Sequence, residues 1–338
     1  MRGFLKLVVA LLVGGLLGFG GLSGYHWVNQ PLGSSSNVYL VDIPPGSSFR
    51  QVASLLHEHH LIRAQWFVTV LGRLQSLDRK IFPGEYEFHE GMRTTDILEK
   101  LAKGELYQHA VTIPEGYSVA QIAEMLDQKG LAKKDEVLKL NQDRGFIRTL
   151  NLSVPTLEGY LFPDTYQFPR YTPPDAILKA MVNRFQEVVT AEIRNQAARM
   201  GMTLQEVLTF ASVVEKETGL PVERPLVAGV FHNRLKKNIP LQSDPTVIYA
   251  IENFDGNIRK ADLSINSPYN TYRVRGLPPG PIANPGLEAI KAVLDPTPSD
   301  YVYFVSRNDG SHEFSATLDE HNRAVDKYQR RSKPKQAS

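Results

Sequence analysis

The sequence predicts an α+β protein with a single N-terminal transmembrane helix, a small α/β module and a larger mixed domain. An uncharged apolar run near the N-terminus predicts the membrane helix. A strand, turn and helix pattern that begins at Val41 and begins again at Val111 predicts the α/β portion. Helical periodicity followed by a hairpin signal in the last third predicts the mixed domain.

Composition excludes several classes of protein. The 338 residues are 42% hydrophobic and 22% charged, which is the balance of a folded domain and not of a disordered chain. Lys plus Arg (38) nearly cancels Asp plus Glu (36), so a dedicated nucleic-acid binder is not expected. The absence of cysteine excludes disulfides, thiolate metal sites and cysteine nucleophiles.

The first residues predict a membrane anchor. Arg2 and Lys6 precede an uncharged stretch, residues 7–25, which as a helix is roughly 28 Å long and matches a bilayer core. A cleaved signal peptide is the alternative, but no clear small-x-small cleavage site follows the run. We expect the basic end to stay in the cytoplasm and the rest of the chain to lie outside. The Gly, Ser and Asn residues at 33–37 predict a flexible tether.

The repeat is the clearest sign of organisation. Each copy has a Pro-x-Gly turn and a Ser N-cap, Ser48 in the first copy and Ser118 in the second, before an amphipathic helix. The first copy continues through a helix at 64–77, an extended segment at 84–88 and a helix capped by Thr94. That string resembles the LysM-like modules that hold cell-wall glycans. Duplication of a scaffold without ligand binding is an equally good reading of the pattern alone.

The predicted boundaries and later elements follow from these signals. The expected parts are a cytoplasmic tail (1–6), a transmembrane helix (7–25), a linker (26–37), a LysM-like module (38–105), a catalytic domain (106–330) and a frayed tail (331–338). Further helices are expected at 134–141, 175–200, 203–218, 222–236, 244–252 and 285–294. A hairpin is expected at 301–316, with a last helix capped by Thr317 and Glu320. His57 and His60 share a helix face but lack a third ligand, so neither a metal nor any cofactor is expected.

One glutamate stands on an apolar helix face. Thr203 and Glu206 form a capping box that begins the helix, and Glu215 projects about 20° from Leu204, on its apolar stripe. Burial without a matched cation raises a carboxyl pKa, which suits a general acid. Glu217 projects about 160° away from Glu215 and is not expected to pair with it. The alternative for Glu215 is a buried ion pair with an arginine of the next helix, Arg224 or Arg234.

Several segments carry groups that suit sugar recognition, because aromatic faces, hydroxyls and amides lie on rigid Pro/Gly loops. These are residues 158–166, 242–246, 269–272 and 276–282. Each also has an ordinary structural reading, such as Asp244-Pro245 as a helix N-cap with proline at the first helical position.

Taken together, the motifs resemble one family. Val-Glu-Lys-Glu-Thr at 214–218, Phe-His-Asn-Arg-Leu at 231–235, the Leu-Gln-Ser-Asp-Pro-Thr run from Leu241, Tyr-Asn-Thr-Tyr at 269–272 and Gly-Leu-Pro-Pro-Gly-Pro-Ile at 276–282 are similar to the endolytic murein transglycosylase, or YceG-like, family. The likeness covers nearly the whole chain. Ser243 stands where other members carry Thr, which keeps the hydroxyl.

The resemblance implies a function and a site. It implies lytic cleavage of the bond between N-acetylmuramic acid and N-acetylglucosamine, leaving 1,6-anhydromuramoyl ends, with Glu215 as the catalytic glutamate. It also implies an inner-membrane protein that faces the periplasm and terminates or releases new glycan strands near the synthases. Candidates for orienting the acid or holding sugar are Glu217, Ser243, Asp244, Tyr269, Asn270, Tyr272, Glu158, Tyr160 and Asp164.

Two other functions remain open at this point. A muramidase would use Asp164 or Asp244 as a second carboxylate and give hydrated reducing ends. A non-catalytic wall-binding scaffold would bind peptidoglycan through the repeat units. A lytic route needs only one carboxyl group, because the C6 hydroxyl of the muramoyl unit is an internal nucleophile.

Overall fold

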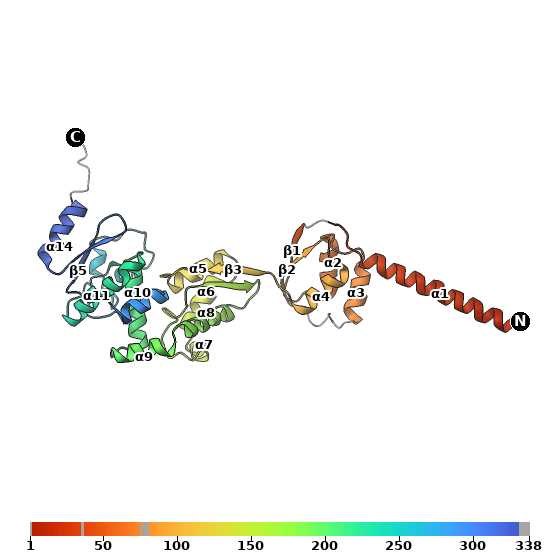
Figure 1. Ribbon diagram of the computed structural model, residues 1–338, viewed down its shortest axis with the longest axis horizontal. Helices are drawn as coiled ribbons and strands as arrows, with labels where there is room; N and C mark the ends of the chain where they lie inside the picture. The colour runs from red at the N-terminus through yellow and green to blue at the C-terminus, as the bar shows by residue number, and fades with distance from the viewer. Residues whose placement is uncertain (1, 35–36, 75–76, 78–80, 331–338) are drawn as a thin grey trace, which may run out of the picture. The chain divides into compact units, whose positions relative to one another are not determined.

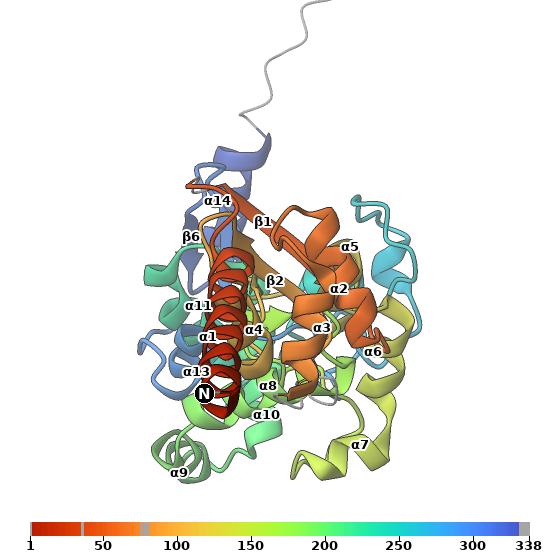
Figure 2. The same ribbon diagram turned by 90° about the vertical axis from the view of Figure 1, so that its right-hand side faces the viewer.

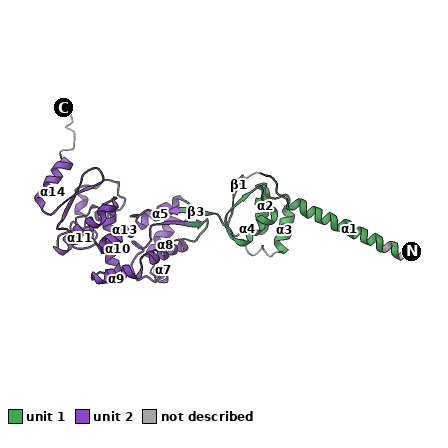
Figure 3. Ribbon diagram, in the orientation of Figure 1, with its two compact units in different colours: residues 1–110, 167–172 green, residues 111–166, 173–338 purple. Residues whose placement is uncertain are grey.

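The structure is a computed structural model of the chain and describes residues 2–34, 37–74, 77 and 81–330 (Figure 1). It divides into two compact units (Figure 3). Unit 1 contains residues 1–110 and 167–172, and unit 2 contains residues 111–166 and 173–338. The predicted frayed tail at 331–338 lies outside the described residues.

Unit 1 begins with helix α1 (Arg2–Asn29), in which Leu7–Asn29 is apolar and long enough to cross a membrane. The helix is longer than predicted, and its last turn is part of the module that follows. Val28 is buried, and its carbonyl accepts a bond from the Thr94 hydroxyl at 3.1 Å. The side chain of Asn29 accepts the backbone N–H of Thr95 at 2.9 Å. Of the predicted tether at 33–37, residues 35–36 lie outside the described residues.

The small module contains β1 (Val38–Ile43), α2 (Phe49–Glu58), α3 (Gln65–Leu74), β2 (Gly84–His89) and α4 (Thr94–Lys103). Strands β1 and β2 pair antiparallel, with Val38 opposite His89. Their inward residues, Val41, Ile43, Tyr86 and Phe88, form a core with the apolar faces of the helices. Figure 2 shows α2 and α3 side by side next to strands β1 and β2.

The predicted cap of α4 is wrong by one residue. Arg93 is the N-cap, and the Asp96 carboxylate accepts its backbone N–H at 3.2 Å. Thr94 is instead the first helical residue, and its hydroxyl donates to the Val28 carbonyl. The end of α1 is therefore bonded to the first turn of α4.

The second copy of the repeat forms β3 (Gln108–Thr112) and α5 (Val119–Gln128), and β3 pairs with β4 (Thr165–Pro169). Both repeat helices begin with the predicted serine. Ser48 with Gln51, and Ser118 with Gln121, make the same reciprocal capping box. The strand, turn and helix prediction is confirmed in both copies.

The rest of unit 2 is mostly helical. It contains α6 (Lys134–Gln142), α7 (Arg144–Thr149), α8 (Pro174–Val188), α9 (Ala191–Arg199), α10 (Leu204–Glu217), α11 (Arg224–Lys236), α12 (Asp244–Tyr249), α13 (Leu287–Leu294), the antiparallel pair β5 (Tyr303–Ser306) and β6 (His312–Ser315), and α14 (Leu318–Val325). The single helix predicted at 175–200 is wrong. It is broken at Val189, because Thr190 caps a new helix by accepting the N–H of Ile193.

Helix α10 is the centre of unit 2. Every residue from Val207 to Val214 is buried, so the helix is covered on all sides. It packs against α13, α11, α12 and α9. The packing holds the last turn of α10, which carries Glu215 and Glu217, inside the unit.

Candidate active site

Glu215 is held in a buried ion pair. Its Oε1 lies 2.6 Å from Arg224, and its Oε2 accepts the backbone N–H of Gly286 at 2.9 Å. The side chains of Glu215 and Arg224 are only 4% and 8% exposed. Arg224 also pairs with Glu115 at 2.9 Å. The expectation that Glu215 lacks a matched cation is therefore wrong, because the turn after α10 brings the first residue of α11 back beside it.

This pairing limits what Glu215 can do. Burial raises the pKa of Glu215, and the charge of Glu115 acts in the same direction; the Gly286 N–H and the Arg224 guanidinium oppose the rise only in part, so the pKa is raised overall. Both carboxylate oxygens are occupied by donors. A carboxylate with both oxygens bonded in this way is better suited to a structural role than to proton exchange with a ligand. Through Arg224 and Gly286 it joins the chain segments that carry Glu115, Glu215, Arg224 and Gly286.

Glu217 has a different environment. Its Oε1 accepts the Ser243 hydroxyl at 2.5 Å, and among the described residues no cation forms an ion pair with it. Burial raises the pKa of Glu217 to about 7, and the negative charge of Asp244 acts in the same direction. Ser243 and the more distant Arg234 partly oppose the rise. A carboxyl group that titrates near neutral pH can both give and take a proton.

Arg234 does not neutralise Glu217 because its guanidinium is used elsewhere. It donates to the backbone carbonyls of Val302 at 2.6 Å and Leu241 at 2.7 Å. Its face lies over the Tyr303 ring, 5.4 Å from the centroid. Arg234 therefore ties the chain segments around the acid without forming an ion pair with it.

Glu217 opens on a pocket of about 280 Å³. The pocket is lined by Glu217, Arg234, Leu241, Gln242, Asp244, Tyr272, Phe304 and His321. Tyr272 donates its hydroxyl to Asp244 at 2.6 Å. An acid, a second carboxylate, hydroxyl and amide groups and aromatic faces thus meet in one cavity, a combination that suits a sugar ring.

A larger groove, of about 960 Å³, lies beside the N-terminus of α5 and one face of α12. Its lining includes Gln121, Asn141, Glu158, Lys216, Tyr249 and Ile248. Glu158 is buried and accepts bonds from the N–H of Val119 at 3.0 Å and the Tyr249 hydroxyl at 3.2 Å. Burial raises the pKa of Glu158 to about 7, although these bonds oppose the rise.

Four of the predicted site residues have internal roles in the structure. Asn270 is fully buried and donates to the carbonyls of Leu263 and Ile265. Tyr269 packs against Tyr249, with ring centroids 4.9 Å apart. Tyr160 is in the core of unit 2. Asp164 pairs with Arg184 at 2.6 Å. None of these four lines the Glu217 pocket.

Three other predicted residues do come together with Glu217, namely Ser243, Asp244 and Tyr272. The sequence reasoning missed His321 and assigned no ligand role to Arg234. Nothing in the local pattern of the last helix marks His321, which reaches the pocket through tertiary packing. Gln242, which also lines the pocket, has a left-handed backbone with φ of 53°.

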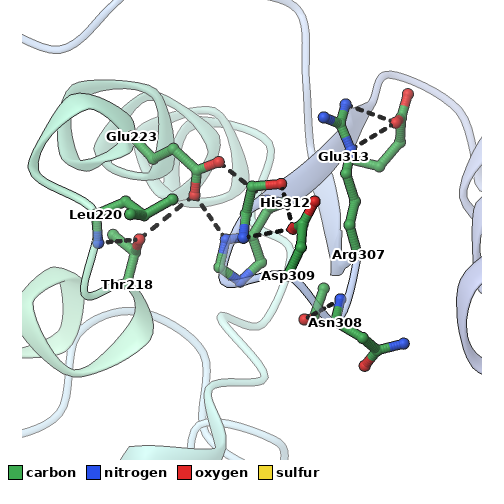
Figure 4. A network of polar contacts seen from close by, with 10 residues as sticks. Thr218, Leu220, Glu223, Arg307, Asn308, Asp309, His312 and Glu313 are labelled. Carbon is green, nitrogen blue, oxygen red and sulfur yellow. Dashed lines mark hydrogen bonds and ion pairs between the residues drawn. The ribbon is translucent and has the colours of Figure 1, made fainter.

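The segment after α10 is fastened to the β5–β6 hairpin, as Figure 4 shows. Glu223 accepts the backbone N–H of His312 at 2.9 Å and lies 2.7 Å from its Nδ1. The Thr218 hydroxyl donates to the same carboxylate at 3.4 Å and accepts the N–H of Leu220 at 3.1 Å. Because Thr218 follows Glu217 directly, these bonds help to fix the acid.

Within the described residues, no group of three or more His, Asp or Glu side chains is placed to bind a metal ion. What the arrangement offers is proton transfer by a partly buried carboxyl group, Glu217, at the wall of a polar and aromatic pocket.

Comparison with known proteins identifies the class. The YceG-like family model matches residues 41–327, so the chain belongs to the YceG-like family. An endolytic murein transglycosylase of Bacillus subtilis is 36% identical over 85% of this chain and 84% of its own length. One of Streptococcus pneumoniae is 32% identical over 92% of this chain, which spans 62% of that relative. The crystal structure of a YceG-like protein from Listeria monocytogenes is similar with a TM-score of 0.61 and 34% identity, covering 86% of this chain and 99% of that one.

Proposed function

We propose that the chain is an endolytic lytic transglycosylase that cleaves the bond between N-acetylmuramic acid and N-acetylglucosamine in peptidoglycan. Two relatives that carry the name endolytic murein transglycosylase align with most of the chain. The observation that carries the proposal is a partly buried carboxyl group, Glu217, with a pKa raised to about 7 at the wall of a polar pocket.

Glu217 is the general acid and base in this proposal, in place of Glu215, which the family resemblance implies. Ser243 occupies one carboxylate oxygen and leaves the other free to carry the proton. The protonated acid donates to the glycosidic oxygen as the bond from C1 breaks. The muramoyl C6 hydroxyl then attacks C1 and returns its proton to the Glu217 carboxylate. One C–O bond breaks, one forms, and no water is consumed.

A pair of matched variants tests this assignment. Glu217→Gln is expected to lose about 10²- to 10⁴-fold in kcat, which is the usual contribution of a general acid. Glu215→Gln is expected to keep measurable activity but to unfold more easily, because Arg224 loses one of its two carboxylates. Anhydromuramoyl ends released from purified glycan strands are the measurement. An active Glu217→Gln protein beside an inactive, fully folded Glu215→Gln protein would return the role to Glu215.

A hydrolase is the second candidate, because Asp244 lines the same pocket as Glu217 and could activate a water molecule. The two reactions differ by one water in the product, so mass spectrometry of the released fragments separates them. We expect anhydro ends, and expect Asp244→Asn not to convert them into hydrated ends. Binding of glycan strands without any release would favour the non-catalytic scaffold.

The 960 Å³ groove is proposed to hold part of the glycan strand. Endolytic cleavage needs sugar units bound on both sides of the broken bond, and the groove residues Lys216 and Pro245 directly adjoin Glu217 and Asp244 in the chain. Ala120, exposed on the groove wall, offers a position to fill it.

Filling the groove tests that role. Ala120→Trp is expected to raise KM for long strands about tenfold, or 1.4 kcal/mol, with kcat unchanged. Ala198→Trp, on an exposed face of α9, is the matched control. Equal KM values in the two variants would remove the groove from the substrate site while leaving the Glu217 assignment intact.

The remaining proposals concern location. We infer that α1 anchors the chain in the cytoplasmic membrane, with its basic end inside and both units on the outer, periplasmic side; a cleaved signal sequence is the competing reading of this helix. The LysM-like character of the small module, and contact with the peptidoglycan synthases, rest on the sequence resemblance. Protease accessibility in spheroplasts tests the orientation.

A further inference from the structure

Helix α3 carries an apolar stripe that no described part of the chain covers. Trp66, Val70 and Leu74 are spaced four residues apart, so they share one face, and they are 65%, 48% and 76% exposed. Val68 and Gly72, on the opposite face, are buried, and Val68 belongs to the module core. An exposed tryptophan in line with two aliphatic residues is a surface that meets an apolar partner.

The position of α3 identifies that partner. The Tyr25 ring near the end of α1 packs edge-on against Phe67 of α3, with centroids 5.6 Å apart. Arg63, just before α3, lies over the Trp27 ring at 5.4 Å and donates to the Pro31 carbonyl at 3.2 Å. Figures 1 and 2 both show α3 beside the end of α1 from which the chain enters the module.

The length of α1 determines how deep in the membrane the contacts of Tyr25 and Trp27 lie. The apolar stretch Leu7–Asn29 has 23 residues, about 34 Å as a helix, against about 30 Å for a bilayer core. Tyr25 and Trp27 therefore reach the level of the outer interface, where tyrosine and tryptophan are enriched in membrane proteins. Val28 and Asn29 at the end of α1 bond to the start of α4, and Tyr25 packs against α3, so these contacts hold the module against the end of α1.

Charge on α3 favours the same surface. The helix has no acidic residue, and Arg73 is exposed beside Leu74. A basic, apolar helix face suits the headgroup region of a bilayer that contains anionic lipid.

We propose that the stripe formed by Trp66, Val70 and Leu74 lies in the outer headgroup layer of the membrane that α1 crosses, so that the small module is held flat on the lipid surface. This inference rests on the proposed membrane anchor. It goes beyond that anchor by assigning a second, peripheral membrane contact to the folded module.

The two tryptophans of the chain, Trp27 and Trp66, provide separate reporters for the anchor and the stripe. The full chain is reconstituted in phosphatidylethanolamine and phosphatidylglycerol vesicles that contain brominated lipid. Trp27→Phe leaves Trp66 as the reporter of the stripe, and Trp66→Phe leaves Trp27 as the reporter of the anchor. The control adds Tyr107→Trp to both substitutions, because the Tyr107 N–H bonds to Glu85 near the start of β2, whereas α1 bonds to the start of α4, which follows the end of β2.

We expect Trp66 to show blue-shifted emission and to lose at least about twice as much intensity to brominated lipid as the Tyr107→Trp reporter does. Val70→Glu in the Trp66 reporter is expected to reverse this loss. Quenching of Trp27 without quenching of Trp66 would overturn the inference and leave the anchor in place. Quenching of neither would overturn both, and equal quenching of Trp66 and the Tyr107→Trp reporter would also contradict a specific contact.

Discussion

At the scale of single residues, the two glutamates of the last turn of α10 have the same side chain and opposite surroundings. Glu215 meets Arg224 and the N–H of Gly286, whereas Glu217 meets a neutral hydroxyl, Ser243. Helical projection correctly indicates that the two point in different directions. It cannot indicate where the cation lies, because the partner belongs to the next helix. The chemistry of each carboxyl group is therefore decided by a tertiary contact.

The raised pKa of Glu217 predicts a pH limit for activity. A general acid must be protonated, and its pKa is about 7, so kcat/KM is expected to fall as pH rises above neutrality. The measurement is the pH dependence of fragment release. A basic limb near the usual glutamate pKa of 4.5 would contradict the assignment.

The same group predicts a stability change with pH. Its folded pKa lies above the unfolded value, so its contribution to stability is complete below about 4.5 and is lost as pH rises through about 7. Glu217→Gln cannot ionise, so at pH well above 7 it is expected to be more stable than the wild type, by up to about 3 kcal/mol. At acid pH the two proteins are expected to unfold alike. Thermal unfolding at both pH values is the measurement.

The hydrogen bond from Ser243 to Glu217 predicts that Ser243 positions the carboxyl group of Glu217. Its hydroxyl donates to Glu217 and lowers that residue's pKa relative to burial alone. Ser243→Ala is expected to lower kcat about tenfold, since one charge-assisted bond is worth about 1.5 kcal/mol or more, and to move the basic limb to higher pH. Ser243→Thr keeps the hydroxyl and is the matched control. An unchanged pH profile in the alanine variant would argue for a purely structural role.

At the scale of helices and strands, local signals predict where elements begin. The capping boxes at Ser48, Ser118, Thr203 and Thr317 all form in the structure. Three predictions fail: the caps expected at Thr94 and Asp244 lie one residue earlier, at Arg93 and Ser243, and a new cap at Thr190 interrupts the helix predicted at 175–200. Local propensity gives way there because tertiary hydrogen bonds and packing contribute more.

The contact between Glu223 and His312 of the β5–β6 hairpin predicts how Glu217 is held in place. Burial raises the pKa of Glu223, but the hydrogen bonds from His312 lower it by more, so the pKa is lowered overall. The contribution of Glu223 to the stability of the fold is therefore present above the usual glutamate pKa. It is lost as the pH falls through the lowered pKa of Glu223 in the folded protein. Glu223→Gln is expected to cost about 1–3 kcal/mol at pH 7 and to reduce kcat more than KM is changed. Calorimetry and strand cleavage measure these effects. Exposed Glu288→Gln on α13 is the control.

At the scale of the whole molecule, the end of the apolar helix α1 is packed into the folded module. The end of α1 supplies the Val28 carbonyl and the Asn29 side chain that complete the start of α4. The anchor is thus a structural part of unit 1.

This junction predicts the effect of truncation. A protein that begins at Pro31 lacks the Asn29 cap and is expected to be less stable than one that begins at Tyr25, by about 1 kcal/mol for the lost cap. Comparison of the two melting temperatures is the measurement. Asn29→Ala in the longer protein is expected to reproduce most of the loss, and equal melting temperatures would contradict this account.

The sequence by itself determined the α+β class, the apolar N-terminal helix, the repeated strand–turn–helix unit and the capped starts of four helices, because each depends on residues within a few positions of one another. Only the tertiary structure decided that Arg224 neutralises Glu215, that Glu217 with Ser243 and Asp244 faces a pocket, and that His321 reaches the same cavity. Burial, charge pairing and pocket formation depend on side chains that are distant in the sequence and become neighbours only when the helices pack.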